Sequence, residues 1–132
     1  MAEMLVSYLA VNPLPGDILV PVPLHRKRLR ERGYNQSGLL AKHLGELTLM
    51  PVIEDCLIRN SYALPQARTQ ALTERRRNVS GAFSCRDGRL AGKRVILIDD
   101  VATSGATMDA CAAAMKSAGA VSVWGLALSR EI

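Results

Sequence analysis

Hydrophobic and polar positions divide the chain into short segments, each with a clear period. Apolar residues recur at helical spacing over residues 1–9 and predict a first helix, which ends in the Asn-Pro-Leu-Pro-Gly stretch 12–16. Residues 17–23 are mostly apolar and predict a short strand, whose pairing stops near Pro21 because proline has no N–H to donate. The basic stretch 24–32 that follows is predicted to be a loop or one loose helical turn.

The same patterning continues to the end of the chain. Asn35 is a candidate N-cap for a helix whose predicted apolar face consists of Leu39, Leu40, Leu44 and Leu47. Further strands are predicted over residues 51–58, 81–85, 95–98 and 121–128. An Ala-rich helix is predicted from about residue 106 to 118, with Gly119 as its C-cap. Trp124 in the last strand is predicted to lie in the core.

This order of elements indicates the fold class. Strands that alternate with helices predict an α/β fold, with a mainly parallel sheet flanked by helices. The length of 132 residues predicts a single domain over residues 1–132. Because ligands of open parallel sheets bind at the carboxyl ends of the strands, the loops expected at the site are residues 23–35, 60–78 and 102–107.

The segment 60–78 interrupts the periodic pattern. It has little apolar periodicity and is highly charged toward its end. A long irregular segment inside a small domain is most often functional, so we predict a lid over the site, with disorder as the alternative. Arg68 is the candidate lid residue for contact with an anionic ligand.

The most informative chemistry lies in residues 95–107. Four apolar residues, 95–98, suit a strand buried on both faces, and Asp99 and Asp100 follow them directly. The next residues carry only small side chains: Ala102, Thr103, Ser104, Gly105, Ala106 and Thr107. Their backbone amides and the start of the next helix can hold a terminal phosphate, while the two acids can accept hydrogen bonds from sugar hydroxyls. This pattern favours a ribose 5-phosphate over an ordinary polar turn.

Composition narrows the class of protein. No apolar run approaches the roughly 20 residues needed to cross a membrane, and the N-terminus has no basic cluster of a secretory signal. We therefore expect a cytoplasmic protein that does not enter membranes. The three cysteines, Cys56, Cys85 and Cys111, are far apart in sequence and form no C-x-x-C pair. They predict free, buried thiols rather than disulfide or zinc ligands.

The net charge of +5 is unevenly distributed. Two blocks carry much of it, one with Arg26, Lys27, Arg28, Arg30 and Arg32, and one with Arg75, Arg76 and Arg77. Such blocks occur on solvated surfaces, on nucleic-acid patches and in the walls of sites for small polyanions. Since both blocks are expected at the same sheet edge as the phosphate loop, we favour a polyanionic ligand.

The order of hydrophobic strand, paired acids and Thr-Ser-Gly-Ala-Thr loop resembles the phosphoribosyl pyrophosphate (PRPP) signature of type I phosphoribosyltransferases. The resemblance implies a Rossmann-like fold that binds PRPP, or a related ribose 5-phosphate, together with Mg²⁺. It also implies that Asp99 and Asp100 act on the ribose hydroxyls and on the outer shell of the metal. No residue is therefore assigned as a direct metal ligand.

Two further segments are similar to the ComF (GntX-like) competence family. One is Val20-Pro21-Val22-Pro23-Leu24-His25 with Arg28 and Arg32-Gly33-Tyr34-Asn35-Gln36, and the other contains Arg68, Thr69, Gln70, Leu72, Arg75, Asn78 and Phe83. The resemblance implies a link to DNA uptake in natural transformation. Members of this family often carry an N-terminal cysteine-rich zinc ribbon, which this sequence lacks, so we expect either a short form or a chain that starts after that module.

The family resemblance also implies functional roles. The loop after Val22 would hold pyrophosphate, with Arg26, Arg28 or Arg32 beside it. We expect a phosphoribosyltransferase with an unassigned acceptor, and a PRPP sensor without turnover is the alternative. No general base is assigned, because Thr103 stands where purine-salvage relatives often carry an acid.

A second hypothesis is a non-catalytic module that uses the arginine blocks to bind single-stranded DNA or a competence protein. Aromatic residues make up only 4% of the chain, which argues against a platform for stacked bases. The sequence leaves the oligomeric state open.

Overall fold

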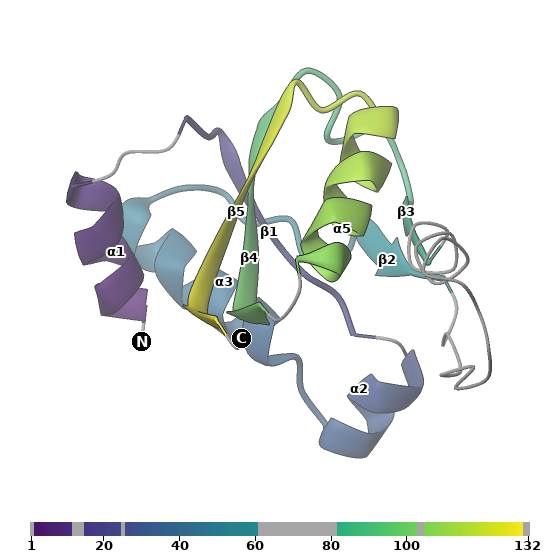
Figure 1. The fold of residues 1–132 in the computed structure, drawn as a ribbon, viewed down its shortest axis with the longest axis horizontal. Coiled ribbons are helices and arrows are strands. Elements are labelled where there is room, and N and C mark those ends of the chain that lie inside the picture. Colours follow the sequence, from purple (N-terminus) through teal and green to yellow (C-terminus); the bar gives the residue numbers. More distant parts are fainter. Residues whose placement is uncertain (1, 12–14, 25, 61–81, 103–104, 131–132) are drawn as a thin grey trace.

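We describe the protein in a computed structural model, which covers residues 2–11, 15–24, 26–60, 82–102 and 105–130. A three-stranded parallel sheet forms its centre, in the strand order β1-β4-β5 (Figure 1). The helices are α1 (Ala2–Val11), α2 (Arg26–Arg32), α3 (Gln36–Thr48) and α5 (Ala106–Ser117). The strands are β1 (Ile18–Pro21), β2 (Leu57–Arg59), β3 (Phe83–Cys85), β4 (Arg94–Ala102) and β5 (Ser122–Arg130). The predicted α/β class, with a parallel sheet flanked by helices, is confirmed.

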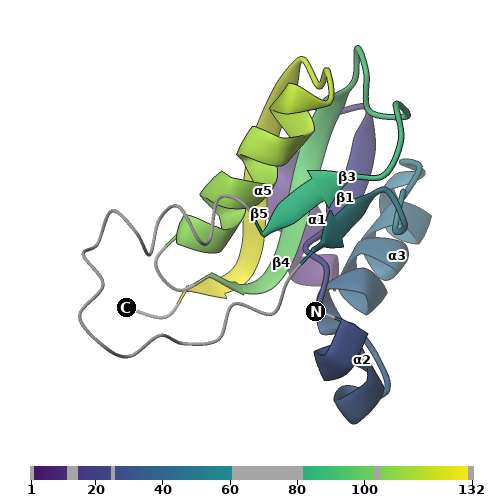
Figure 2. The same ribbon diagram turned by 90° about the vertical axis from the view of Figure 1, so that its right-hand side faces the viewer.

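The central strand β4 shows why the sheet is buried on both faces. Val95 and Leu97 pack into a core together with α5 and the β2–β3 hairpin, whereas Ile96 and Ile98 pack into a second core with α1 and α3. Successive side chains of a strand point to opposite faces, so a continuous apolar run fills both cores. Figure 2 shows the same arrangement, with α5 on one side of the sheet and α3 on the other.

Two of the predicted ends are confirmed. Strand β1 stops at Pro21, although Val22 N still donates to Ile98 O at 2.8 Å. Helix α5 ends before Gly119, whose φ of 101° is easily adopted by glycine. The basic stretch after residue 24 differs from the prediction, because it forms the two-turn helix α2 instead of a loop or a single turn.

The predicted strand 51–58 was wrong as a single element. Its first part runs beside β1, where Leu19 N donates to Pro51 O and Ile53 N donates to Leu19 O. Its last part belongs to β2, which pairs antiparallel with β3 in a separate two-stranded sheet. A segment with one apolar pattern therefore serves two different sheets.

Two other predictions of burial were wrong. Trp124 of β5 is 46% exposed, and on α3 only Leu40 and Leu44 of the predicted apolar face are buried. Leu39 and Leu47 on the same helix are exposed. Among the described helices, none has the length and apolar composition needed to cross a membrane.

Candidate functional site

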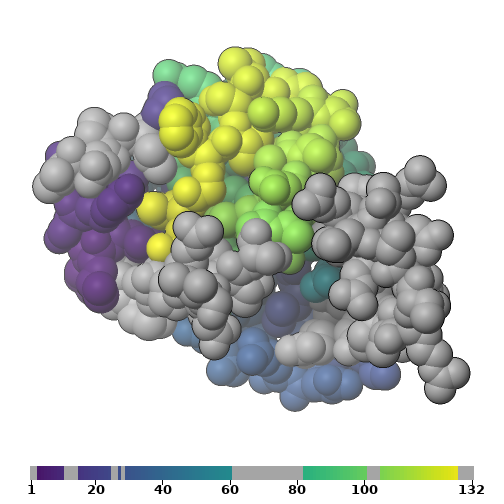
Figure 3. All heavy atoms as spheres, in the orientation of Figure 1, coloured from purple at the N-terminus to yellow at the C-terminus, as the bar shows by residue number. Residues whose placement is uncertain are grey.

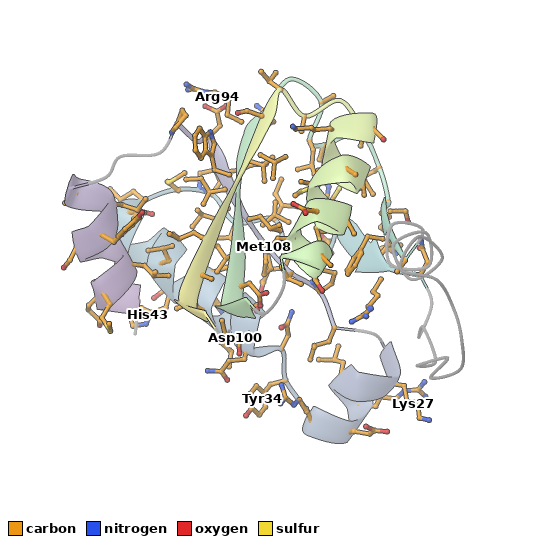
Figure 4. The ribbon with its side chains drawn as sticks, in the orientation of Figure 1. Lys27, Tyr34, His43, Arg94, Asp100 and Met108 are labelled. Atoms are coloured by element: carbon orange, nitrogen blue, oxygen red, sulfur yellow. The ribbon has the colours of Figure 1, made fainter. Side chains whose placement is uncertain are left out.

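The two acids of the PRPP-like signature lie inside β4, near its carboxyl end. Asp99 lies opposite Ala127 of β5 in the parallel register and is 9% exposed, while Asp100 is partly buried. The strand continues to Ala102, so the acids are held by sheet pairing rather than by a loose turn. Figure 4 shows Asp100 at the end of β4 that faces the α2 end of the molecule, where Tyr34 is also labelled.

A buried hydroxyl joins the two acids. Ser37 lies in the first turn of α3, is 4% exposed, and its Oγ lies 3.2 Å from Asp99 Oδ1 and 3.2 Å from Asp100 Oδ1. The same Oγ also accepts a hydrogen bond from Asp100 N at 3.2 Å. One side chain therefore fixes both carboxylates relative to α3 and to the backbone of β4.

Asn35 places that hydroxyl. As the N-cap of α3 it accepts a hydrogen bond from Ser37 N on its Oδ1 at 3.1 Å, which confirms the predicted cap. Its Nδ2 donates to Val22 O at 3.2 Å, across to the loop after β1. The loop that is predicted to hold pyrophosphate and the two acids are thus linked through the start of α3.

The described part of the phosphate loop fits an anion-binding turn. Gly105 precedes α5 with a φ of 82°, and no atom lies within 4 Å of where a Cβ would stand. Ala106 and Thr107 begin helix α5, and the N-terminus of a helix carries a partial positive charge. Thr103 and Ser104 lie outside the described residues. The left-handed backbone of Gly105 suits a tight turn between β4 and α5, and phosphate binding by this loop stays a prediction.

The arginines predicted to contact pyrophosphate are only partly described. Arg26 and Arg28 belong to α2, and Arg32 is exposed at the end of that helix. Arg68, together with the whole predicted lid, lies outside the described residues. In Figure 3, α2 lies at the lower edge of the molecule, below α5 and β5.

A cleft of about 570 Å³ opens beside Asn35. Its lining combines apolar side chains with charged and amide groups: Pro23, Leu24, Leu29, Arg30, Asn35, Glu54, Leu57, Ile58, Arg59 and Asn60. The cleft is bordered by the loop after β1, by α2, by the start of α3 and by β2. Arg30 belongs to the predicted basic block, so part of that block does face a cavity.

The charge of Asp99 affects the pKa of a buried thiol, that of Cys111 in α5. Burial raises the pKa of the Cys111 thiol to about 12, and the charge of Asp99 contributes to the rise while that of Arg59 opposes it. Cys56, Cys85 and Cys111 are free thiols, as predicted, although Cys85 is only partly buried. Among the described residues, no cluster of three or more His, Cys, Asp or Glu side chains could hold a metal ion.

Sequence patterns did not reveal three residues of this region, namely Ser37, Glu54 and Arg59. Ser37 lies 62 positions from Asp99, and no local motif signals that the two side chains meet. Arg59 ends the short strand β2 and Glu54 precedes it, and the sequence pattern did not predict the pairing of that strand. The cap at Asn35 was the one available signal, because it predicts where the first turn of α3 begins.

Comparison with known proteins agrees with this geometry. Residues 40–127 match the phosphoribosyl transferase domain family, and the chain belongs to that family. It is 33% identical to "Competence protein F" of Haemophilus influenzae over 84% of this chain and 50% of that protein. It is also 33% identical to "Competence protein ComFC" of Bacillus subtilis, over 77% of this chain and 39% of that protein. These relatives confirm the resemblance to the ComF family.

Further relatives and a solved structure support the family and the fold. "DNA utilization protein YhgH" of Escherichia coli K12 is 32% identical over 82% of this chain and 48% of that protein. The chain thus spans about half the length of the curated relatives it matches, or less. The glutamine PRPP amidotransferase of B. subtilis shares the fold with a TM-score of 0.65, at 24% identity over 96% of this chain and 25% of that one.

Proposed function

We propose that this chain is a ComF-family phosphoribosyltransferase domain that binds PRPP with Mg²⁺ and transfers its phosphoribosyl group to an acceptor. The observation that carries the proposal is the position of Asp99 and Asp100 at the carboxyl end of β4, next to the turn at Gly105 that starts α5. Carboxylates can accept hydrogen bonds from the two ribose hydroxyls, and the amides at the start of α5 can hold the 5-phosphate. A cytoplasmic location belongs to the same proposal, since free thiols are typical of a reducing compartment.

The residues at the carboxyl end of β4 suit a Mg²⁺ ion that arrives bound to the phosphates of PRPP. They offer two carboxylates and a hydroxyl, which are oxygen donors, and no described cluster supplies a complete ligand set. Mg²⁺ commonly binds through one or two carboxylates together with substrate phosphates and water. When bound, the ion would neutralise charge on the pyrophosphate. Asp99 and Asp100 would then orient the ribose and contribute to the outer shell of the ion.

In the proposed reaction the bond between the anomeric carbon and pyrophosphate breaks while a bond to the acceptor nucleophile forms. The anomeric carbon gains positive charge in the transition state, and the fixed carboxylates beneath the ribose stabilise that charge. The arginines near the loop after β1 stabilise the leaving pyrophosphate. The described residues do not identify a base for the acceptor's proton.

Calorimetry with Mg-PRPP tests the binding step. We expect wild-type protein to bind, and the double variant Asp99→Asn/Asp100→Asn to lose binding, because an amide replaces each negative charge with little change in volume. Glu46→Gln, an exposed acid of α3, is the control for the change in charge. Wild-type affinity in the double variant would refute the proposed site.

Turnover is tested by pyrophosphate release from Mg-PRPP over a panel of candidate acceptors. Release with one acceptor, lost in the Asp99/Asp100 double variant, supports a transferase. Binding without release for every acceptor would leave a PRPP sensor as the function.

One observation favours a second candidate, DNA binding through α2. This helix lies at one end of the molecule and carries five basic residues in seven positions, and several relatives are named for competence or DNA utilization (Figure 1). Binding to phosphates by such a helix would weaken steeply with salt. Salt-dependent binding of single-stranded DNA that survives Asp99→Asn/Asp100→Asn, with no binding of Mg-PRPP, would favour this module.

A further inference from the structure

The Nε–H group of Arg59 is a buried hydrogen-bond donor without an acceptor among the described residues. Its Nε is shielded from solvent and has no hydrogen-bond partner within the part of the chain that the structure describes. Leaving a buried donor unsatisfied is costly, and more so for a charged group, so such groups call for an explanation. Ser122 Oγ, the other buried side-chain atom of this kind, lies at the start of β5 and does not line the cleft beside Asn35.

Phe83 of the neighbouring strand β3 restrains the side chain of Arg59. Arg59 lies opposite Phe83 in the β2–β3 pairing, and its guanidinium carbon is 5.4 Å from the centre of the Phe83 ring. Packing a cation on an aromatic face restrains the planar guanidinium before any ligand arrives. The group is therefore preorganised, which lowers the entropy cost of binding.

Arg59 lines the cleft of about 570 Å³, a volume within the range of small-molecule sites. The charged residues in the lining are Arg30, Arg59 and Glu54, so the cleft carries one net positive charge. The rest of the lining is apolar or carries amide groups, so these three side chains set the charge of the cleft. Glu54 limits how much negative charge the cleft accepts.

Asn35 connects the lining of the cleft to the acid pair. Asn35 lines the cleft and also holds Ser37, whose hydroxyl contacts Asp99 and Asp100. The charges of Arg59 and Asp99 also act in opposite directions on the pKa of the same thiol, that of Cys111 in α5. The cleft and the acid pair therefore share Asn35 as a structural link.

We propose that Arg59 anchors an oxyanion in this cleft, as a binding residue separate from the arginines of α2. The planar guanidinium offers its orphaned Nε–H and a terminal N–H to a phosphate-type or carboxylate-type oxygen pair. The oxyanion has two sources, the pyrophosphoryl end of the sugar ligand or a separate anionic molecule bound beside it. The first source rests on the proposed function, whereas the anchoring role of Arg59 does not.

Titration calorimetry with inorganic pyrophosphate tests this inference in phosphate-free buffer at constant salt. We expect Arg59→Met to weaken pyrophosphate binding about tenfold or more, the loss typical of a charge-assisted hydrogen bond. Arg59→Lys keeps the charge but lacks the planar fork, so we expect an intermediate loss. The matched control is Arg86→Met, an exposed arginine after β3 that does not line the cleft. Thermal unfolding confirms that each variant is folded.

The same variants distinguish the two sources. If pyrophosphate competes with Mg-PRPP and Arg59→Met weakens both ligands while ribose 5-phosphate binds as before, the anchor holds the pyrophosphoryl end. If pyrophosphate binds together with Mg-PRPP, and Arg59→Met weakens only pyrophosphate, the anchor holds a separate anion. Both outcomes support the inference.

Three results would overturn it: no pyrophosphate binding by the wild-type protein, wild-type affinity in both folded Arg59 variants, or an equal loss in Arg86→Met. The proposed function fails separately. In that case Asp99→Asn/Asp100→Asn would bind Mg-PRPP as wild type does, while Arg59→Met would still lose pyrophosphate.

Discussion

At the scale of single residues, the hydroxyl of Ser37 lies within hydrogen-bonding distance of two carboxylates but can donate to one at a time. The hydroxyl has a single hydrogen, so it donates to Asp99 or to Asp100 but not to both, while accepting from Asp100 N. Either carboxylate can receive that hydrogen, so the hydroxyl orients the two acids as a pair. Ser37 is thus a positioning residue for the acid pair.

Removing this hydroxyl should affect both stability and binding. We expect Ser37→Ala to lower the free energy of unfolding by about 1–3 kcal/mol, because buried polar groups lose a partner. We also expect it to weaken Mg-PRPP binding about tenfold, since the acids are no longer held in place. Chemical denaturation and calorimetry measure the two effects, with Ser7→Ala on the exposed side of α1 as the control. Unchanged Mg-PRPP affinity in folded Ser37→Ala would assign the hydroxyl a structural role only.

Asn35 allows its two roles to be separated. Asn35→Asp keeps the oxygen that caps α3 but loses the Nδ2 donor to Val22 O, whereas Asn35→Ala loses both. We expect Asn35→Ala to destabilise the protein by about 1 kcal/mol through loss of the cap. Asn35→Asp should be less destabilising by denaturation and should still weaken Mg-PRPP binding, because the loop after β1 is released. Equal stability losses in the two variants would contradict this division.

At the scale of elements, the junction between β4 and α5 depends on the backbone of Gly105. Its φ of 82° lies in the left-handed region, which costs a residue with a Cβ about 1–2 kcal/mol. Since nothing lies within 4 Å of its notional Cβ, a loss of stability in Gly105→Ala would come from backbone conformation and not from a clash.

Gly88→Ala provides the matched control. Gly88 also has open space around its notional Cβ, but its φ is not in the positive region. We expect Gly105→Ala to be about 1–2 kcal/mol less stable than wild type by chemical denaturation, and Gly88→Ala to be close to wild type. Equal effects of the two substitutions would show that φ at Gly105 is not what limits the turn.

Elements with a strong local signal were predictable from the sequence. Helix α5 and strand β4 follow from an Ala-rich helical stretch and an apolar run, and Asn35 marked the start of α3. The division of residues 51–58 between two sheets was not predictable, because pairing with β1 or with β3 is decided by distant partners. Trp124 was misplaced for a related reason: its exposure depends on what covers the outer strand β5.

The candidate site was predictable to the same extent. Asp99, Asp100 and the following loop are adjacent in sequence, so their pattern was visible before the fold. Ser37 meets the two acids, and Arg59 meets Asn35 in the lining of the cleft, only after the chain has folded, because α3 and β2 lie far from β4 in sequence. Local pattern therefore predicted the groups proposed to hold the sugar and its phosphate, but not the residues that support them.

At the scale of the whole molecule, the sheet separates two cores of different chemistry. The core beneath α1 and α3 is aliphatic, with Leu5, Leu19, Leu40, Leu44 and Ile96 among its members. The core between the sheet, α5 and the β2–β3 hairpin also contains the cysteines. Burial raises the pKa of Cys85 to about 11 and that of Cys111 to about 12, from an ordinary value of 9.0. The folded protein therefore favours neutral thiols where the unfolded chain would ionise.

This difference predicts a loss of stability in alkali. A thiol whose pKa is raised by folding contributes fully below pH 9 and loses its contribution as the pH rises toward the folded pKa. At pH 10 the unfolded chain gains about 1.4 kcal/mol from ionising a thiol of pKa 9.0, which Cys111 in the folded protein cannot match. Because other groups also titrate there, the quantity to measure is the difference in unfolding free energy between wild type and Cys111→Ser at pH 8 and at pH 10. We expect the wild-type advantage to shrink by about 1 kcal/mol. A constant difference across this range would mean that Cys111 ionises in the folded protein as readily as in the unfolded chain, and that the core around α5 admits water.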